Sequence, residues 1–442
     1  MLKTIIANGK TEFEALCGLA GRGAAPGADV ESAVRGIIED VRAEGDEAVI
    51  RYALRFDGPC AAPGGRIGTL TRADLKAAFE SLDKGLADAL LHAAENIRAY
   101  HKKQADALKG YEEKFADEDG EDVIIGQTVR GLTRVGVYVP GGTAAYPSTV
   151  LMNVIPAKLA GVEEILMATP PRGGEQGFPT DAIILGAAYI AGVDMVALAG
   201  GAQAVAAMAY GTETIPRVDK IVGPGNIYVA TAKRLLFGVV DIDMIAGPSE
   251  ILVIADESAD AAFASADLLS QAEHDPDSAS ILLTTSPGAA EVVSALTSAL
   301  IASCPRAATA NDSLKRNGLI IVCRSEDEMV TIANEIAPEH LEILTVDPFA
   351  LLARIRNAGS VFLGPWTPEP VGDYYSGTNH VLPTSGTARF ASPLGVYDFV
   401  KRMSYTRYTE AALKKAKDDI AALAEAEGLP AHAEAVRVRF KE

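Results

Sequence analysis

The sequence of 442 residues is poor in cysteine, and the placing of its four cysteines excludes two common kinds of site. No two cysteines form a C-x-x-C pair, so neither a zinc ribbon nor a thioredoxin-like dithiol can be built. A long hydrophobic run is also missing, because the most apolar stretch, 182–211, is interrupted by Asp194 and Gln203. The apolar run at the amino terminus is too short for a signal peptide. We therefore expect a cytoplasmic protein that does not contact a membrane.

Basic residues are scarce relative to acidic ones. Against 59 aspartates and glutamates stand 40 lysines and arginines, which leaves a net charge of −19. Nucleic acid and anionic membranes would be repelled by such a chain, so neither is expected as a partner. The charge suits a protein that handles a small molecule, including a cationic one. The hydrophobic fraction of 48% is that of a folded protein with at least one substantial core.

Short apolar strands and helices alternate through two long stretches of the chain, 134–237 and 250–363. This alternation predicts parallel sheets that are covered by helices. Before the first stretch, apolar residues at helical spacing predict long helices over 28–56 and 73–104. We therefore expect an α/β fold with two Rossmann-like parallel-sheet domains, a small helical amino-terminal segment and a carboxyl-terminal helical tail.

The expected domain boundaries follow the changes of pattern along the chain. Glycine, proline, threonine and serine crowd the stretch 365–393, which predicts a long loop. A helix over 409–427 is expected to end at Gly428 and Pro430, and the residues around His432 are expected to be extended. The predicted parts are an amino-terminal segment 1–27, a main α/β domain of 28–136 and 249–394, a second α/β domain 137–248 and a tail 395–442.

Only six histidines occur, and four of them lie beside other candidate ligands or catalytic partners. His92 and His101 fall in the helix predicted over 73–104, and we expect both to be ordinary helix residues. The remaining four are His274, in the motif Gln271-Ala-Glu-His274, His340, which follows Glu339, His380, which lies near Asp373, and His432, which lies near Glu427. Such clustering suggests a metal or acid–base site that is assembled from distant segments.

Each of these motifs has an ordinary explanation when it is taken alone. Gln271 and His274 lie three residues apart at a helix end, where their oxygen and nitrogen can face one ion or cap the helix. Glu339 and His340 can form an oriented general base or a surface pair. Asp373 can be a hard ligand or a loop acid held by backbone amides. Together, Gln271, His274, Asp373 and His432 suffice for a zinc site with nitrogen and oxygen ligands.

Three glycine-rich turns, 140–143, 200–203 and 223–226, each follow a predicted strand and precede a predicted helix. Backbone N–H groups in such a turn can bind phosphate. None of the turns completes the G-x-G-x-x-G fingerprint, because Tyr228 stands where a third glycine would follow Gly223 and Gly225. These turns by themselves therefore leave nucleotide binding open.

Taken in order along the chain, these motifs resemble those of the histidinol dehydrogenases. The combination is far more specific than any single motif, and the resemblance extends over nearly the whole chain. The segments that carry it are 137–148, 200–203, 223–226, 246–250, 270–274, 338–340 and 372–383, together with the tail that contains His432.

The resemblance implies a zinc-dependent, NAD-linked enzyme that oxidises L-histidinol through L-histidinal to L-histidine, the last steps of histidine biosynthesis. It implies one Zn²⁺ per subunit, held by Gln271, His274, Asp373 and His432, with Glu339 and His340 as the acid–base pair. NAD would be contacted by Tyr138, Gln203 and Asn226. The substrate would be contacted by Ser249, Gln271, His274, His340, Glu369, Asp373, His380, Glu427 and His432.

The resemblance also implies a homodimer in which the tail carries His432 to the active site of the partner subunit. Related enzymes oxidise other hydroxy compounds, such as dihydroxypropanesulfonate, but a sulfonate favours basic residues where this chain has Glu369 and Glu427. These acids therefore favour L-histidinol. A zinc hydrolase is an alternative that would not need the glycine-rich turns, and a non-catalytic metal-binding protein would not need Glu339 and His340.

Overall fold

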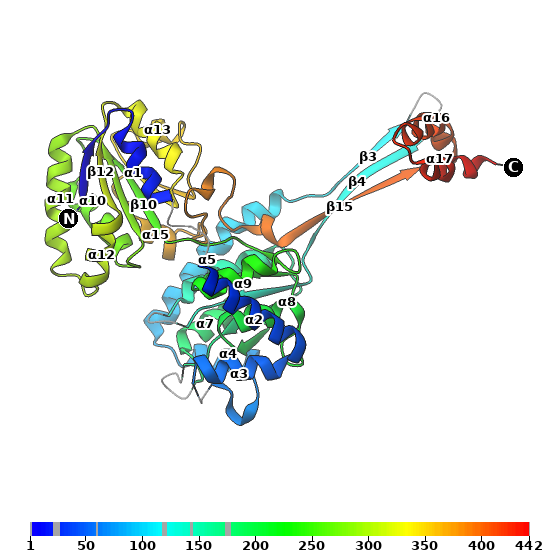
Figure 1. The fold of residues 1–442 in the computed structure, drawn as a ribbon, viewed down its shortest axis with the longest axis horizontal. Helices are drawn as coiled ribbons and strands as arrows, with labels where there is room; N and C mark the ends of the chain where they lie inside the picture. The colour runs from blue at the N-terminus through cyan, green and yellow to red at the C-terminus, as the bar shows by residue number, and fades with distance from the viewer. Residues whose placement is uncertain are drawn as a thin grey trace.

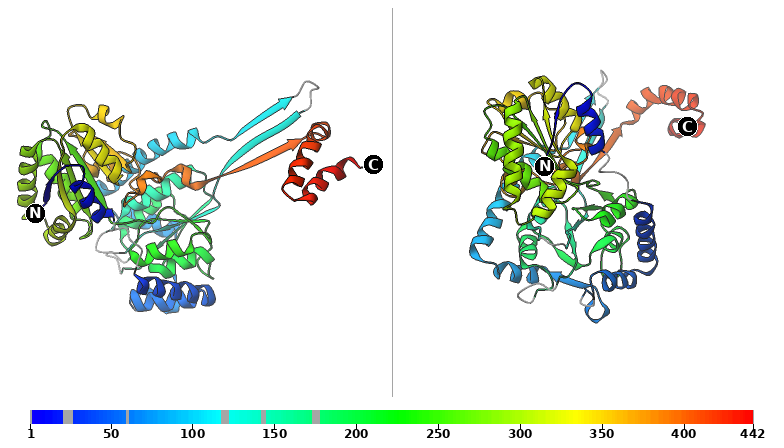
Figure 2. Two further views of the ribbon diagram at one scale, coloured as in Figure 1. Left: turned by 45° about the horizontal axis from the view of Figure 1, so that its top comes forward. Right: turned by 60° about the vertical axis from the view of Figure 1, so that its left-hand side comes forward.

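The computed structural model describes residues 2–20, 27–58, 61–116, 122–141, 145–172 and 178–441. Two α/β lobes lie side by side, and a long arm extends from them and ends in two helices (Figures 1 and 2). The predicted α/β class, with parallel sheets and helical segments near both ends of the chain, is confirmed. Among the described helices, none is both long and apolar enough to cross a bilayer.

Lobe I is built on a parallel sheet of six strands in the order β1-β12-β11-β10-β13-β14. Its strands are nearly all apolar, as expected for a sheet covered on both faces. On one face lie α10 (Ala261–Ala272), α11 (Pro287–Ile301) and α12 (Ala307–Asn317), and on the other lie α1 (Thr11–Ala20), α13 (Glu326–Ile336) and α14 (Pro348–Leu352). The strands are β1 (Lys3–Ile6), β10 (Glu250–Ala255), β11 (Ala279–Thr284), β12 (Gly318–Val322), β13 (His340–Leu344) and β14 (Ser360–Leu363).

Lobe II has a sheet of six strands in the order β2-β7-β6-β5-β8-β9, in which β2 alone runs antiparallel to its neighbour. One face is covered by α4 (Arg72–Glu80), α5 (Lys84–Ala107), α6 (Pro147–Leu159) and α7 (Ala182–Ala191). The other is covered by α2 (Ala28–Glu44), α3 (Asp46–Phe56), α8 (Gly201–Tyr210) and α9 (Ile227–Leu236). The strands are β2 (Gly68–Thr71), β5 (Arg134–Tyr138), β6 (Glu164–Thr169), β7 (Met195–Leu198), β8 (Lys220–Val222) and β9 (Asp241–Ile242).

The structure divides the chain differently from the predicted domains. Helices α2 to α5 do not join 249–394, because their apolar residues share cores with lobe II; Val34 and Ile37 of α2, for example, pack with Val205 of α8. Strand β1, from the segment predicted to stand alone, pairs with β12 of lobe I. Two long predicted helices are also broken, 28–56 at Gly45, where φ is 58°, and 73–104 between α4 and α5.

The arm consists of three antiparallel strands, β3 (Tyr111–Ala116), β4 (Asp122–Gly131) and β15 (Val400–Tyr408). At its tip lie α16 (Glu410–Ala426) and α17 (Pro430–Arg437), far from both lobes (Figures 1 and 2). The prediction of an extended tail around His432 is wrong. Pro430 stands in the first turn of α17, where a missing N–H costs no helical hydrogen bond, so the proline begins a second helix.

Candidate active site at the amino ends of β10 and β13

Glu339 and His340 lie at the amino end of β13, where this strand is paired with β10. The Glu250 backbone holds both side chains. Its N–H donates to Glu339 Oε2 at 2.9 Å, and its carbonyl accepts from His340 Nδ1 at 3.1 Å. Both side chains are buried, with only 6% and 4% of their residues' surface exposed. The predicted pair therefore lies inside lobe I, and the alternative of an ordinary surface pair is excluded.

The Glu250 carbonyl fixes the tautomer of the neutral His340 ring. A carbonyl oxygen can only accept, so Nδ1 carries the proton and Nε2 keeps its lone pair. No hydrogen bond from the described residues reaches Nε2, which lies 3.8 Å from Asp373 Oδ1 and 3.9 Å from Glu369 Oε1. Burial lowers the pKa of His340 to about 4, against the opposing effect of the Asp373 carboxylate. The ring is therefore a neutral base with its free nitrogen turned towards two acids.

These two acids come from α15 (Glu369–Tyr374), a short helix inside the stretch 365–393 that was predicted to be a loop. The Glu369 N–H donates to Glu342 Oε1 at 2.7 Å. Glu342 follows His340 by two residues on β13, so both point to one face of the sheet. This bond ties the start of α15 to the strand, and one helical turn later Asp373 comes opposite His340.

Two further buried acids next to this site were missed from the sequence. Asp267 of α10 and Glu342 contact each other through their carboxyl groups. Burial raises the pKa of Glu342 and of Glu369, and the neighbouring carboxylates Asp267 and Asp373 respectively raise them further. Burial also raises the pKa of Glu339 well above its usual value. A glutamate in the middle of the apolar strand His340-Leu-Glu-Ile-Leu344 was the available signal for Glu342, since buried charges mark functional sites.

Three of the predicted metal ligands come from elements that adjoin at this point. Gln271 lies one residue before the end of α10 and has no exposed surface, and among the described residues neither its amide oxygen nor its amide nitrogen has a hydrogen-bond partner. The Ser270 hydroxyl donates to Glu369 Oε2 at 3.3 Å and so links this helix end to α15. His274 lies in the following turn, near enough for its charge to affect the pKa of His340. Ligand atoms of His340, Glu369 and Asp373 lie within 4.8 Å of one another.

The remaining predicted substrate and metal residues divide into near and distant ones. His380 donates from Nδ1 to the Asp373 carbonyl at 3.1 Å, and Ser249 directly precedes Glu250. In contrast, Glu427 and His432 are exposed at the tip of the arm, where α17 lies far from the sheet of lobe I (Figure 1). A single chain therefore does not bring His432 to Gln271, His274 and Asp373.

The three predicted NAD contacts lie at carboxyl ends of the lobe II strands. The Tyr138 hydroxyl accepts the Gly201 N–H at 3.0 Å, and burial raises the pKa of this phenol to about 12. Gln203, in the first turn of α8, is buried, and its Oε1 has no hydrogen-bond partner in the part of the chain that the structure describes. Asn226 caps α9 by accepting the N–H groups of Tyr228 and Val229 at 3.0 and 3.2 Å. Part of the first glycine-rich turn, Gly142 and Thr143, lies outside the described residues.

A buried ion pair, which the sequence analysis missed, holds the third glycine-rich turn. Lys233 donates to the Gly223 carbonyl at 2.8 Å, and Asp243 accepts the Gly223 N–H at 2.8 Å while it pairs with Lys233. Gly223 has a φ of 110°, and a Cβ there would come 2.1 Å from the Tyr138 carbonyl oxygen. Only glycine fits this position, so β5 and β8 can approach closely where they diverge into loops. A lysine on the apolar face of α9 was the available signal.

Comparisons with known proteins agree along almost the whole chain. A family model described as histidinol dehydrogenase matches residues 21–440. Histidinol dehydrogenase of Streptococcus mutans is 53% identical over 413 residues, which cover 93% of each chain, and that of Listeria monocytogenes is 52% identical over the same share. A crystal structure of histidinol dehydrogenase from Elizabethkingia anophelis has a TM-score of 0.88 and 38% identity, and the match covers 99% of this chain and 98% of that chain.

Proposed function

Because the chain belongs to the histidinol dehydrogenase family, and is therefore an oxidoreductase, we propose that it oxidises L-histidinol through L-histidinal to L-histidine with NAD⁺ as the hydride acceptor. The observation that carries this proposal is the buried pair Glu339-His340. It places a neutral imidazole, with its free nitrogen available, among the acids of α15. That nitrogen is suited to accept a hydroxyl proton at neutral pH.

We further propose that the resident metal is zinc. Gln271, His274 and Asp373 offer the amide oxygen, imidazole nitrogen and carboxylate oxygen that zinc accepts, and the unpartnered buried amide of Gln271 supports the assignment. His432 of the partner subunit would complete the set. When bound there, zinc would supply positive charge that orients the substrate's hydroxyl and lowers the pKa of its oxygen.

The chain's own residues account for the proton movements of both oxidations. In the first, His340 Nε2 takes the hydroxyl proton while the carbinol carbon passes its hydride to NAD⁺. His340 then releases this proton to solvent. In the second oxidation it takes a proton from the water that adds to the aldehyde, the resulting hydrate anion passes a hydride to another NAD⁺, and the carboxylic acid that forms loses its proton to give L-histidine. Glu339, whose pKa burial raises, is placed beside the His340 ring to assist the second proton transfer. Glu250 fixes the ring throughout by accepting from Nδ1.

Recognition of the substrate is assigned to groups around this base. Ser249, directly before β10, and His380, in the segment after α15, are assigned to the substrate, and the Glu369 carboxyl is assigned to the cationic groups of an amino alcohol. Glu427 of the partner subunit would add a second acid. NAD is assigned to the carboxyl ends of β5, β7 and β8, with Tyr138, Gln203 and Asn226 as contacts, and the strand order of lobe II reverses between β5 and β8.

Incubation of the purified protein with NAD⁺ and L-histidinol tests the activity through the absorbance of NADH. We expect twice as much NADH as L-histidinol consumed, loss of turnover with a chelator and recovery with Zn²⁺. Reduction of NAD⁺ by dihydroxypropanesulfonate but not by L-histidinol would contradict the proposed substrate. Hydrolysis without NAD⁺ reduction would indicate the zinc hydrolase instead.

The position of the arm supports a homodimer with shared active sites. His432→Ala and His340→Ala chains, each inactive alone, should regain part of the activity when mixed and allowed to exchange, because one mixed site would then hold both intact residues. Absence of recovery in mixtures shown to contain heterodimers would contradict the shared site.

A further inference from the structure

Helix α5 lies where the two lobes meet, close to α15 (Figure 1), and it carries a second buried histidine that the proposed reaction does not use. Its apolar face, with Leu90, Ala94 and Ile97, packs in the core of lobe II. His101 follows one turn later and has no exposed surface. His92, two and a half turns earlier on the same helix, is exposed. The expectation that both are ordinary helix residues therefore holds for His92 but leaves the burial of His101 unexplained.

The contacts of His101 explain its burial. Its Nδ1 lies 2.8 Å from the Ile97 carbonyl, so this nitrogen carries the proton and Nε2 is an acceptor. Nε2 accepts from Asn379 Nδ2 at 3.3 Å. The same Nδ2 donates its other hydrogen to the Met152 carbonyl of α6 at 2.7 Å, and Asn379 Oδ1 accepts the Val381 N–H at 2.9 Å. Every polar group of the Asn379 amide is thus engaged, and the bond to Val381 brackets His380.

Two neighbours of His101 on α5 hold the same segment on either side. Asn96 Nδ2 donates to the Tyr375 carbonyl at 2.7 Å, and Gln104 Oε1 accepts the Val396 N–H at 3.0 Å. Gly377, whose φ is 94°, lies so close to α5 that a Cβ would come 2.3 Å from the Asn96 carbonyl oxygen. The segment from Tyr375 to Val396 is therefore fixed at both ends and in the middle by one helix of lobe II.

The bracketed residue connects this segment to the candidate active site. His380 donates from Nδ1 to the Asp373 carbonyl at 3.1 Å and lies 3.9 Å from Asp373 Oδ1. Its backbone is set by Asn379, and its ring is set by Asp373. A displacement of Asn379 would therefore move His380, a proposed substrate contact, and disturb Asp373, to which His380 is hydrogen-bonded.

We propose that His101 and Asn379 are positioning residues, which fix His380 and through it the geometry around Asp373 for binding of the amino alcohol. His101 itself does not reach substrate, since both of its nitrogens are occupied within the protein. Its Nε2 gives Asn379 a hydrogen-bond acceptor, which an apolar residue would lack. Its Nδ1, on the opposite side of the ring, donates to the Ile97 carbonyl of the helix. This inference rests on the proposed function, because the role of His380 does.

The test compares His101→Phe, which keeps a buried ring but removes the acceptor, with His101→Gln, which places an amide oxygen near the position of Nε2. His92→Phe is the matched control on the same helix. For His101→Phe we expect kcat/KM for L-histidinol to fall about 100-fold, as misplacement of a substrate contact by an ångström does, while KM for NAD⁺ stays within about twofold. His101→Gln should recover most of the loss, and His92→Phe should match the wild type.

Asn379→Ala provides a second route if His101→Phe does not fold. It should lower kcat/KM for L-histidinol in the same way, and in the double variant the two losses should not multiply, because both act through one contact. Equal effects on L-histidinol and NAD⁺, multiplying losses, or His101→Gln no more active than folded His101→Phe would each overturn the proposal.

Hydrogen exchange of the full-length, zinc-loaded chain separates this proposal from the proposed function. His101→Phe should increase exchange within 375–396 and leave β10 and β13 protected. If the wild type does not oxidise L-histidinol but exchange rises in this way, the substrate assignment is wrong, and the positioning role of His101 and Asn379 is supported. Unchanged exchange within 375–396 would overturn the positioning role of His101 and Asn379, whether or not the protein oxidises L-histidinol.

Discussion

The two lobes share one strand order but use opposite ends of their sheets. Counted along the chain from β10 and from β5, both sheets read 3-2-1-4-5, with one earlier strand, β1 or β2, added beside strand 3. In lobe II the proposed nucleotide contacts follow β5, β7 and β8, at the carboxyl ends, as the rule for open α/β sheets expects. In lobe I the buried pair Glu339-His340 lies at the amino end of β13. The same topology therefore does not decide which end becomes the site.

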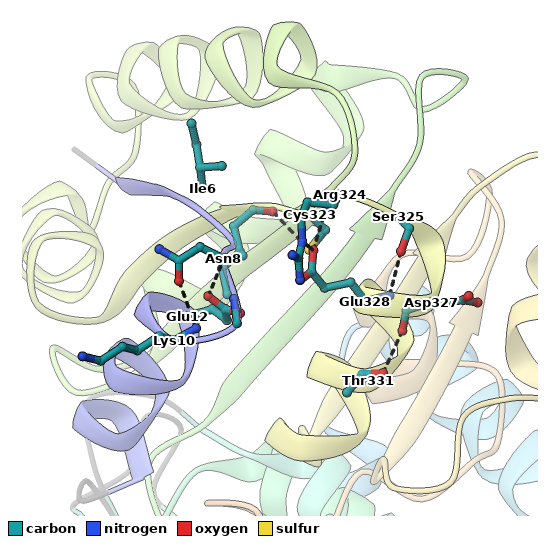
Figure 3. A network of polar contacts seen from close by, with 12 residues as sticks. Ile6, Asn8, Lys10, Glu12, Cys323, Arg324, Ser325, Asp327, Glu328 and Thr331 are labelled. Carbon is teal, nitrogen blue, oxygen red and sulfur yellow. Dashed lines mark hydrogen bonds and ion pairs between the residues drawn. The ribbon is translucent and has the colours of Figure 1, made fainter.

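At the carboxyl end of the lobe I sheet, the edge that β1 and β12 form differs from the proposed nucleotide site of lobe II. Figure 3 shows local polar contacts closing this edge beyond β1 and β12. Glu12 accepts the N–H groups of Asn8 and Gly9 at 3.0 and 2.6 Å, and Arg324 pairs with Glu328 on the next helix. In lobe II, backbone N–H groups at the corresponding ends of the strands can bind a phosphate. In lobe I, the N–H groups after β1 instead donate to the Glu12 side chain of the same lobe.

Removal of the base at the amino end of β13 should have the largest effect. His340→Ala should lower kcat with L-histidinol about 10²–10⁴-fold, the range for loss of a general base. KM for NAD⁺ should change little, because the carboxyl ends of lobe II are untouched. Steady-state kinetics with both substrates measures this, with His92→Ala as the control. A kcat within tenfold of the wild type would show that the amino end of lobe I does not supply the base.

A break of the buried ion pair in lobe II should come next. Lys233→Met leaves the Asp243 carboxylate buried without its cation and should lower the free energy of unfolding by about 3–5 kcal/mol. It should also raise KM for NAD⁺ more than KM for L-histidinol, since the pair holds Gly223. Urea denaturation and kinetics measure both quantities. Lys158→Met, which breaks the more exposed pair with Asp194, is the control and should cost about 0–1 kcal/mol.

Two glycines at carboxyl ends of the two sheets permit a direct comparison. Gly223 and Gly9 both have positive φ, at 110° and 89°, but only at Gly223 would a Cβ meet another atom within 4 Å. Gly9→Ala should therefore cost only the backbone strain of about 1–3 kcal/mol, and Gly223→Ala should cost more and raise KM for NAD⁺. Equal losses of stability, or an equal rise in KM for NAD⁺, would contradict the assigned difference between the two edges.

The smallest effect concerns the histidine between the lobes. Burial lowers the pKa of His101, although the Ile97 and Leu394 carbonyls act in the opposite direction. The unfolded state therefore binds the proton first as the pH falls below about 6.5, and stability is lost by up to about 1.4 kcal/mol per pH unit. Stability is full above that pH. His101→Gln should flatten the curve of unfolding free energy against pH between 7 and 5; an unchanged slope would refute the assignment.

Much of the fold could be predicted because lobe strands are buried on both faces. The alternation of strands and helices predicted over 134–237 and 250–363 is confirmed, since β5, β6, β8 and β11 are each an apolar run between turns. β3 and β15 escaped because their residues are almost all exposed and show no apolar face. The sequence also did not predict which lobe each amino-terminal helix joins, because the pattern of an amphipathic helix such as α2 does not reveal which of two sheets it covers.

The candidate site could be predicted where motifs carried it and not where single residues did. Glu339-His340, Gln271 and Asp373 were named as candidates because several polar groups stand close together in the sequence. Glu342 is a lone polar residue within an apolar strand, and Lys233 and His101 stand in helices beside other basic residues, so no motif marks any of them. The partners of Glu342 and His101 are distant in sequence, since His101 and Asn379 are 278 positions apart, so only the folded chain reveals these contacts.

The length of the arm makes the position of its tip sensitive to small movements at its base. The arm is attached through the paired ends of β4 and β15, where the Leu132 N–H donates to the Phe399 carbonyl, and its tip lies far from this base (Figure 2). A small rotation at such a base sweeps the tip through a large arc. The chain that carries α17 therefore cannot aim it with the accuracy that a metal ligand needs. Under the proposed shared site, the surface of the partner subunit that receives the tip must fix its position, and selection for accuracy at His432 should act on that surface more than on the arm.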